Sequence, residues 1–214
     1  MPEKQYVTYG CCGCGCGTEL PITGCRFSLA PMCDDFVDVI LGAIGRVDTS
    51  KVWKKTDRLS TVYRGKACHV EDAVKTCFVE AYREGTHMTM ELTFSKGCPG
   101  DIDGDSYLAM DDILCNEPNI QDARFPVDCK IALYPMGVTD YMSHIAHIVN
   151  RAVDLGIYGG SAHYCTLLSA DVQTLFSYIS EVNAYCGENL SHYVFEVTLS
   201  VNSPTKAKNI GDIF

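Results

Sequence analysis

The chain lacks any apolar run long enough to cross a membrane, and it has few basic residues. A transmembrane helix needs about 20 consecutive apolar residues, and no segment of this 214-residue sequence offers them. Residues 1–6 also lack the apolar stretch of a signal peptide. Lys and Arg total 17 against 27 Asp and Glu, a formal charge of −10, whereas nucleic-acid phosphates require a basic surface. We therefore expect a cytoplasmic protein with no membrane insertion and no nucleic-acid partner.

The 13 cysteines do not follow the pattern of a disulfide framework or a zinc site. Their odd number argues against complete pairing, and most stand singly in apolar surroundings, where a reduced cysteine packs as a small hydrophobic side chain. The exception is Cys11–Cys16, where cysteine and glycine alternate. Structural zinc sites usually separate paired cysteines by about two to four residues and add a second pair elsewhere. We favour an N-terminal tail, and we keep a metal-binding or redox protein acting through Cys11–Cys16 as the alternative function.

The chain repeats itself at a distance of about half its length. Residues 87–95, HMTMELTFS, reappear as residues 192–200, HYVFEVTLS, at an offset of 105. The segment 29–32, LAPM, matches 133–136, LYPM, at an offset of 104, a slip that one loop residue can absorb. This period exceeds the roughly 20–50 residues of solenoid repeats and indicates two copies of a small domain.

Each copy is predicted to contain the elements β-α-β-β-α-β, the ferredoxin-like unit. In the first copy, strand 25–30 precedes a helix whose apolar residues from Phe36 to Val47 recur at helical spacing. The hairpin 52–64, a second helix over 70–81 and strand 88–95 complete the unit. In the second copy we expect strand 130–134, helix 141–155, a Gly159-Gly160 turn, strand 163–168, helix 172–182 and strand 192–200. The prediction is an α+β fold of tandem ferredoxin-like repeats with antiparallel sheets, one face of each covered by helices.

The predicted domain boundaries follow from these elements. The two repeats span residues 24–100 and 129–205, and residues 101–128 form the linker between them. Residues 1–23 and 206–214 are tails.

Alternation along the last strand of each repeat separates an apolar face from a polar one. Met88, Met90, Leu92 and Phe94 point to one side, and Glu91 lies among hydroxyl residues on the other. The second copy places Glu196 in the same way. Such a face either meets water or, if it is covered, forms a polar cavity in which a buried carboxylate needs a hydrogen-bond donor such as an aminopyrimidine.

Three other patterns are weaker. Asp101–Asp112 resembles a calcium loop, but Ser106 replaces the glycine and Asp112 the glutamate of that motif, so a linker is favoured. His163 and Cys165 lie two apart on a predicted strand without an orienting third group. His144 and His147 lack further metal ligands. We predict no catalytic residues, no metal site and no cofactor, so the protein is not expected to be an enzyme.

Many blocks in order between residues 24 and 205 resemble the YkoF family. They are Phe27-Ser-Leu-Ala-Pro-Met32, Asp34-Asp-Phe36, Asp48-Thr-Ser-Lys-Val-Trp53, Lys55-Thr-Asp57, Ser60-Thr-Val62, Arg64-Gly65, Thr93-Phe-Ser95, Gly97-Cys-Pro-Gly-Asp101, Gly104-Asp105, Ala132-Leu-Tyr-Pro-Met136, Asp140-Tyr-Met142, His163-Tyr164 and Asn202-Ser-Pro204. The resemblance implies a homodimer that binds thiamine or its hydroxymethylpyrimidine moiety, without catalysis, once per repeat, in vitamin uptake or salvage.

The candidate ligand contacts combine this resemblance with the polar face. They are Ser28, Trp53, Thr61 and Glu91 in the first repeat and Tyr134, Thr166 and Glu196 in the second. The carboxylates would accept hydrogen bonds from the aminopyrimidine, the hydroxyls would orient the ligand, and Trp53 and Tyr134 would stack. Strand parity decides the assignment of Trp53 and Thr61, because a register slip of one residue moves a side chain to the other face.

Overall fold

The computed structural model describes residues 22–96 and 105–205. Within the first repeat the elements are β1 (Thr23–Pro31), α1 (Phe36–Arg46), β2 (Trp53–Thr56), β3 (Thr61–Gly65), α2 (Ala67–Ala81) and β4 (Met88–Lys96). Short helices α3 (Asp105–Leu108) and α4 (Glu117–Ile120) follow, and then β5 (Pro126–Met136), α5 (Tyr141–Asp154), β6 (Tyr158–Ala162), β7 (Cys165–Asp171), α6 (Val172–Asn189) and β8 (His192–Val201). None of the described helices is long and apolar enough to span a membrane.

Both repeats have the predicted order of elements, and their strands form one continuous sheet. The strand order is β2-β3-β1-β4-β8-β5-β7-β6, with antiparallel neighbours throughout. Strands β4 and β8 join the repeats, pairing from Met88 with Val201 to Lys96 with Tyr193. The prediction of tandem ferredoxin-like repeats is therefore confirmed, and the two expected sheets are the halves of one eight-stranded sheet.

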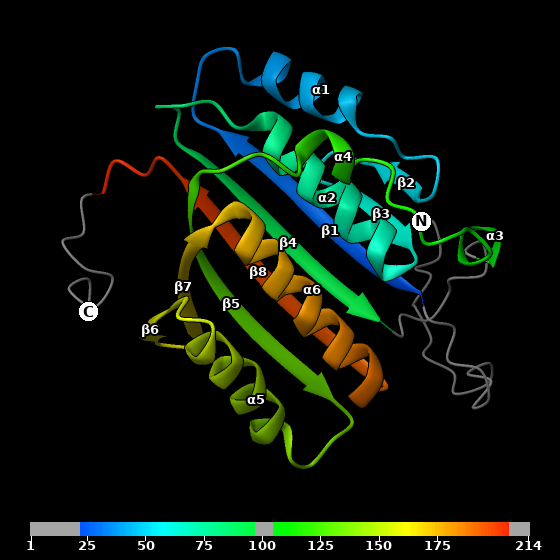
Figure 1. Cartoon of the computed structure of the whole chain (residues 1–214), viewed down its shortest axis with the longest axis vertical. Helices are drawn as coiled ribbons and strands as arrows, with labels where there is room; N and C mark the ends of the chain where they lie inside the picture. The colour runs from blue at the N-terminus through cyan, green and yellow to red at the C-terminus, as the bar shows by residue number, and fades with distance from the viewer. Residues whose placement is uncertain (1–21, 97–104, 206–214) are drawn as a thin grey trace, which may run out of the picture.

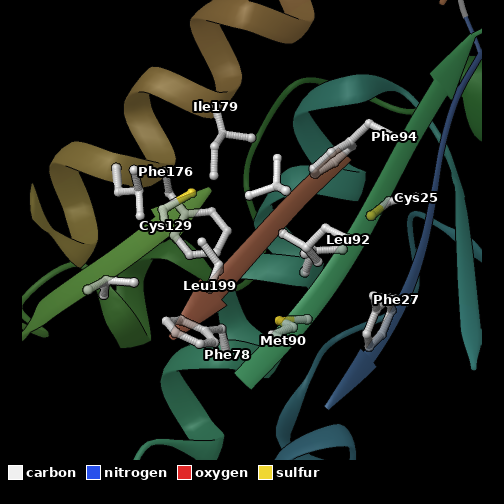
Figure 2. Packing of buried hydrophobic residues seen from close by; sticks show 14 of the residues in the cluster. Cys25, Phe27, Phe78, Met90, Leu92, Phe94, Cys129, Phe176, Ile179 and Leu199 are labelled. Carbon is white, nitrogen blue, oxygen red and sulfur yellow. The ribbon is translucent and has the colours of Figure 1, made fainter. Parts of the chain in front are cut away.

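The helices lie on one face of this sheet (Figure 1), and we call the opposite face, which no element of the described residues covers, the open face. Figure 2 shows how the sheet meets them: Met90, Leu92 and Phe94 of β4 point into a core that also contains Phe78 of α2 and Phe176 of α6. These side chains are buried because alternate residues of each strand point to the helix-covered face. The intervening residues of β4 and β8, including Glu91 and Glu196, point to the open face.

Helices α2 and α6 lie side by side over the junction of the two repeats (Figure 1). The rings of Phe78 and Phe176 pack with centroids 6.0 Å apart. Beside them, the Glu71 carboxylate accepts hydrogen bonds from Ser180 Oγ at 2.6 Å and Asn183 Nδ2 at 2.9 Å. Burial raises the pKa of Glu71. The junction thus combines an aromatic contact with a polar one.

The segment before β5 is tied to the first repeat by Asn116. Its backbone N–H and its Nδ2 donate to Asp72 Oδ2 at 3.0 Å and 2.8 Å, and its Oδ1 accepts from the backbone N–H of Asp48 at 2.7 Å. Lys75 pairs with Glu117 at 2.7 Å. These contacts hold the chain against α2 as it crosses to the second repeat.

The second hairpin differs from the prediction in its turn. Gly159 and Gly160 lie inside β6, where the register shifts between Tyr158 and Gly160, and Gly160 has φ +136°. The turn consists of His163 and Tyr164, so β7 begins at Cys165 rather than at His163. The expected Gly-Gly turn was wrong because glycine also serves irregularities within a strand, where its backbone freedom accommodates an extra residue.

Candidate ligand-binding site

The open face carries the same row of side chains twice, in opposite directions. Strand register aligns one row as Lys130, Thr198, Glu91 and Ser28 across β5, β8, β4 and β1. It aligns the other as Arg26, Thr93, Glu196 and Ala132 across β1, β4, β8 and β5. Each row reads cation, threonine, glutamate and small residue, with equivalent positions 104 or 105 apart in the sequence. The two repeats are therefore related by an internal twofold that passes between β4 and β8.

A pocket of about 350 Å³ lies on this face, over the second repeat and the strand β4 that joins it. Its wall consists of Glu91, Leu92, Thr93, Lys130, Ile131, Ala132, Tyr134, His163, Tyr164, Cys165, Glu196, Val197 and Thr198. The volume falls within the about 300–1,000 Å³ that is typical of small-molecule sites. The polar face that carries Glu91 and Glu196 thus contains a concave surface of suitable size.

The pocket combines negative charge with hydrogen-bonding groups. Glu91 and Glu196 are both exposed in the single chain, and across the β4–β8 pair Glu91 lies opposite Thr198 and Glu196 opposite Thr93. Lys130 is also exposed, and no carboxylate in residues 22–96 and 105–205 lies within ion-pair distance of its ammonium. A ligand with N–H donors would find two carboxylate acceptors here, and its polar substituents would find hydroxyl groups and one ammonium.

Three of the seven predicted contacts line this pocket. Glu91 and Glu196, assigned to separate repeats, contribute to one wall, and Tyr134 of β5 contributes a ring that is 48% exposed. Ser28 lies next to Glu91 on β1 and faces the same side. It borders the pocket residues without being one of them.

Trp53 lies far from the pocket, on the other edge of the sheet. Strand β2 is the first strand of the order, whereas the pocket lies over β4, β8, β5 and β7. The Trp53 ring lies under the guanidinium of Arg64, whose central carbon is 5.5 Å from the ring centroid. Trp53 therefore stacks with a residue of its own hairpin.

Thr61 and Thr166 point to the helix-covered face, and their prediction as pocket residues needs correction. Thr61 pairs with Phe27 and Thr166 with Ile131, and directly opposed residues of antiparallel strands share a face. Both threonines are buried, and Thr61 Oγ1 lies 3.0 Å from Thr56 Oγ1. Pairing with the neighbouring strand decides which face each threonine takes, and the repeat pattern alone did not give that pairing.

The prediction omitted six pocket residues with polar side chains, namely Thr93, Lys130, His163, Tyr164, Cys165 and Thr198. The repeat itself could have identified Lys130, because it occupies the position of Arg26 at an offset of 104. His163 and Cys165 were paired on one strand, whereas His163 belongs to the turn. Their common location depends on where the β6–β7 turn folds over the sheet, which no sequence pattern shows.

The first repeat uses its cation differently. Arg26 donates to Asp57 Oδ2 at 3.0 Å and to Ser60 Oγ, both in the turn of the β2–β3 hairpin. The backbone N–H of Leu59, the Arg26 guanidinium and the N–H of Ser60 together lower the pKa of Asp57 to about 2. Arg26 is thus held by the β2–β3 hairpin of its own repeat, although its position in the row is equivalent to that of Lys130.

The two histidines of α5, His144 and His147, both contact Tyr185. No group of three or more His, Cys, Asp or Glu that could hold a metal ion occurs in residues 22–96 and 105–205. His144 Nδ1 lies 2.9 Å from the hydroxyl of Tyr185, and the ring of His147 stacks on Tyr185 with centroids 4.0 Å apart. The Cys11–Cys16 motif and Asp101–Gly104 of the calcium-like segment lie outside the described residues.

Comparison with known proteins identifies relatives of the whole repeat pair. The model of the YKOF-related family matches residues 22–101 and again residues 126–206. A protein of Bacillus subtilis (strain 168), which carries the provisional name HMP/thiamine-binding protein YkoF, is 42% identical over 191 residues, covering 89% of this chain and 95% of the relative. Since both repeats match the family model and the identity extends over most of both chains, this chain belongs to the YKOF-related family.

Proposed function

We propose that the protein binds thiamine or its hydroxymethylpyrimidine moiety in the pocket over β4, β8 and β5, without catalysing a reaction. The observation that carries the proposal is the convergence of Glu91, Glu196, Thr93 and Thr198 in one pocket of ligand size. The family relationship supports it, because the Bacillus subtilis relative is named for HMP/thiamine binding. As a binding protein, it would serve vitamin uptake or salvage in the cytoplasm.

In this proposal the carboxylates recognise the aminopyrimidine. Its exocyclic amine offers N–H donors, and a carboxylate accepts at both oxygens. These hydrogen bonds are stronger than neutral ones because the acceptor is charged. Thr93 and Thr198 supply hydroxyls that either donate or accept, and Tyr134 packs against a ring. The thiazolium of thiamine carries a positive charge, which suits a pocket with two acids and one ammonium.

We propose one site per repeat on the basis of the internal twofold. The second-repeat site contains Glu196 beside Ala132, and its equivalent in the first repeat contains Glu91 beside Ser28. The first site has Arg26 in place of Lys130, and this arginine is already bonded to Asp57. We therefore propose two related sites that differ in the cation available to a ligand.

Isothermal titration calorimetry of the full chain with thiamine and with hydroxymethylpyrimidine tests this function. Heat with a stoichiometry near two per chain is expected for one site per repeat. A stoichiometry near one would restrict binding to one repeat, and the variants of Glu91 and Glu196 would identify it. Absence of heat with both compounds would contradict the proposed function.

We also propose that the protein is a homodimer. None of the helices in residues 22–96 and 105–205 lies over the open face of the sheet, and exposed aromatic or aliphatic side chains such as Tyr134, Tyr164 and Leu59 belong to its strands and hairpin turns. A second copy is the partner implied for this face. Sedimentation velocity should give a dimer mass at micromolar concentration, and a monomer across the concentration range would contradict the proposal.

A further inference from the structure

Tyr164 occupies a backbone conformation that its residue type disfavours. It is the second residue of the two-residue turn between Ala162 and Cys165, and its φ is +70°. In turns with a positive φ at this position, glycine or asparagine is usual, because the Cβ atom of other residues approaches the backbone too closely. A bulky aromatic residue therefore imposes strain on this hairpin.

The other non-glycine residue with positive φ in the described ranges illustrates the contrast. Asn202 has φ +53°, belongs to a residue type that tolerates this region, and is fixed by its Nδ2, which donates to the carbonyls of Arg83 and Thr86 at 3.0 Å each. Tyr164 has neither advantage. Its ring lies beside the ring of His163, at a centroid distance of 6.2 Å, and the residue is 97% exposed.

The same tyrosine belongs to the pocket wall. It shares the pocket with Tyr134, Glu196 and Lys130, and the turn that carries it lies where β7 begins beside β5. Because Tyr164 belongs to the pocket wall and is 97% exposed, its ring has room to swing over a molecule that enters. Strained residues of this kind occur at ligand sites, where the strain is retained because the side chain is needed there.

We infer that Tyr164 is a specificity-determining residue of the second-repeat site, whose ring stacks on the cationic heteroaromatic part of the ligand. This inference rests on the proposed function. The face of a tyrosine ring attracts a cation within about 6 Å, and the attraction is stronger when ligand and ring exclude water from each other. The carboxylates hold the aminopyrimidine, and Tyr164 selects the ligands that also carry a thiazolium.

The chain offers a matched control in the first repeat. Leu59 stands 105 positions before Tyr164, lies in the turn of the equivalent hairpin and is 86% exposed. Its φ is not positive. A change of Leu59 to asparagine removes a large exposed side chain from a turn without relieving strain and without altering the pocket.

The experiment compares Tyr164→Asn, Tyr164→Phe, Tyr164→Leu and Leu59→Asn in the full chain. Thiamine and hydroxymethylpyrimidine are titrated by calorimetry, and melting temperatures are measured without ligand. The relevant site is the one that Glu196→Gln weakens. Tyr164→Asn should lower thiamine affinity about 5- to 30-fold, change hydroxymethylpyrimidine affinity less than about twofold, and raise the melting temperature by about 2 °C because the turn is relieved.

The other variants separate the ring from the strain. Tyr164→Phe should keep thiamine affinity within about threefold, since its ring face also attracts cations. Tyr164→Leu should lose affinity as Tyr164→Asn does, with an unchanged melting temperature. Leu59→Asn should leave both affinities at this site unchanged.

Three results would overturn the inference. Unchanged thiamine binding in Tyr164→Asn, in a protein whose wild type binds thiamine, would refute it while the proposed function stands. An equal loss of both ligands would mean that Tyr164 shapes the pocket rather than selecting a cation. Loss of affinity together with loss of the dimer in sedimentation would identify Tyr164 as an interface contact. If the wild type binds neither compound, the proposed function fails and the inference fails with it.

Discussion

The two repeats share one sheet geometry and differ in what their hairpin turns do with it. In the first repeat, Asp57 and Ser60 bind Arg26, which occupies the cation position of its row. In the second repeat the equivalent Lys130 lines a pocket, and the shorter turn contributes His163 and Tyr164 to the same wall. The repeat places the two rows in equivalent positions, and the hairpin turns decide which cation lines the pocket.

The helix-covered face shows a second difference between the repeats. Helices α2 and α6 begin 105 residues apart, so Glu71 is equivalent to Phe176 and Phe78 to Asn183. The internal twofold would make the two contacts across the junction alike. Instead, one is the aromatic contact of Phe78 with Phe176 and the other is the hydrogen bond from Asn183 to Glu71. Such a polar contact favours one register of the two helices at a cost in desolvation.

Breaking the aromatic half of the junction should have the largest effect. Phe78 is fully buried, so Phe78→Ala removes apolar contacts and leaves a cavity. We expect the free energy of unfolding, measured by urea denaturation, to fall by about 3–5 kcal/mol. Phe36→Ala is the control, because Phe36 on α1 is 49% exposed and should contribute far less. Similar losses in the two variants would contradict the packing described for α2 and α6.

Neutralising the glutamate of each repeat compares the two proposed sites directly. Glu196→Gln should weaken binding at the second-repeat site about 10- to 100-fold, since a hydrogen bond to a charged group contributes about 1.5–3 kcal/mol. Glu91→Gln should produce the corresponding loss at the first-repeat site and a smaller loss at the second-repeat site, because Glu91 also lines that pocket. Calorimetric titration with thiamine measures both, and Glu84→Gln, an exposed acid remote from the pocket, serves as control. An identical isotherm for wild type and Glu196→Gln would exclude this carboxylate as a contact.

Neutralising Glu71 tests the polar half of the junction. Burial raises the pKa of Glu71, so the folded protein favours the protonated carboxyl. This preference stabilises the fold fully below the unfolded pKa of about 4.3. The stabilisation is lost as the pH rises through the pKa of the folded protein. Glu71→Gln can keep both hydrogen bonds without the charge. We expect Glu71→Gln to raise the free energy of unfolding by about 1 kcal/mol at pH 7 and to leave it unchanged at pH 4.

Urea denaturation at the two pH values measures this difference. Glu188→Gln on the exposed side of α6 is the control and should show no such pH dependence. A loss of stability at pH 7 in Glu71→Gln would mean that the charge itself holds the helices together.

Releasing Arg26 should have the smallest effect on stability, because its ion pair with Asp57 is exposed. The pKa of Asp57 is lowered to about 2 in the folded protein. The ionised carboxylate therefore contributes to stability above its unfolded pKa of about 4, and this contribution is lost as the pH falls through the pKa of the folded protein. Asp57→Asn should therefore lower the melting temperature slightly at pH 7, and the difference from wild type should shrink toward pH 2. A difference that grows on acidification would contradict the pairing.

The sequence alone predicted most elements of the fold and the sheet face on which Glu91 and Glu196 lie. Helical spacing from Phe36 to Val47 and strand alternation over residues 88–95 are local patterns that burial on one face requires, and they correspond to α1 and β4. The same alternation placed Glu91 and Glu196 on the open face. The prediction was less successful for the hairpins, where Thr61 and Thr166 proved buried, because register across a turn depends on pairing with another strand.

The amino-acid sequence by itself determined that this protein has two ferredoxin-like repeats and that each places one glutamate opposite its apolar strand face. Only the tertiary structure decided that β4 pairs with β8, which brings both glutamates into one pocket with Thr93 and Thr198. It also decided that Arg26 is bonded to its own hairpin while Lys130 lines the pocket. The physical reason is that periodicity records which face of an element is buried, whereas a site depends on which elements become neighbours and on how their turns fold over the shared face.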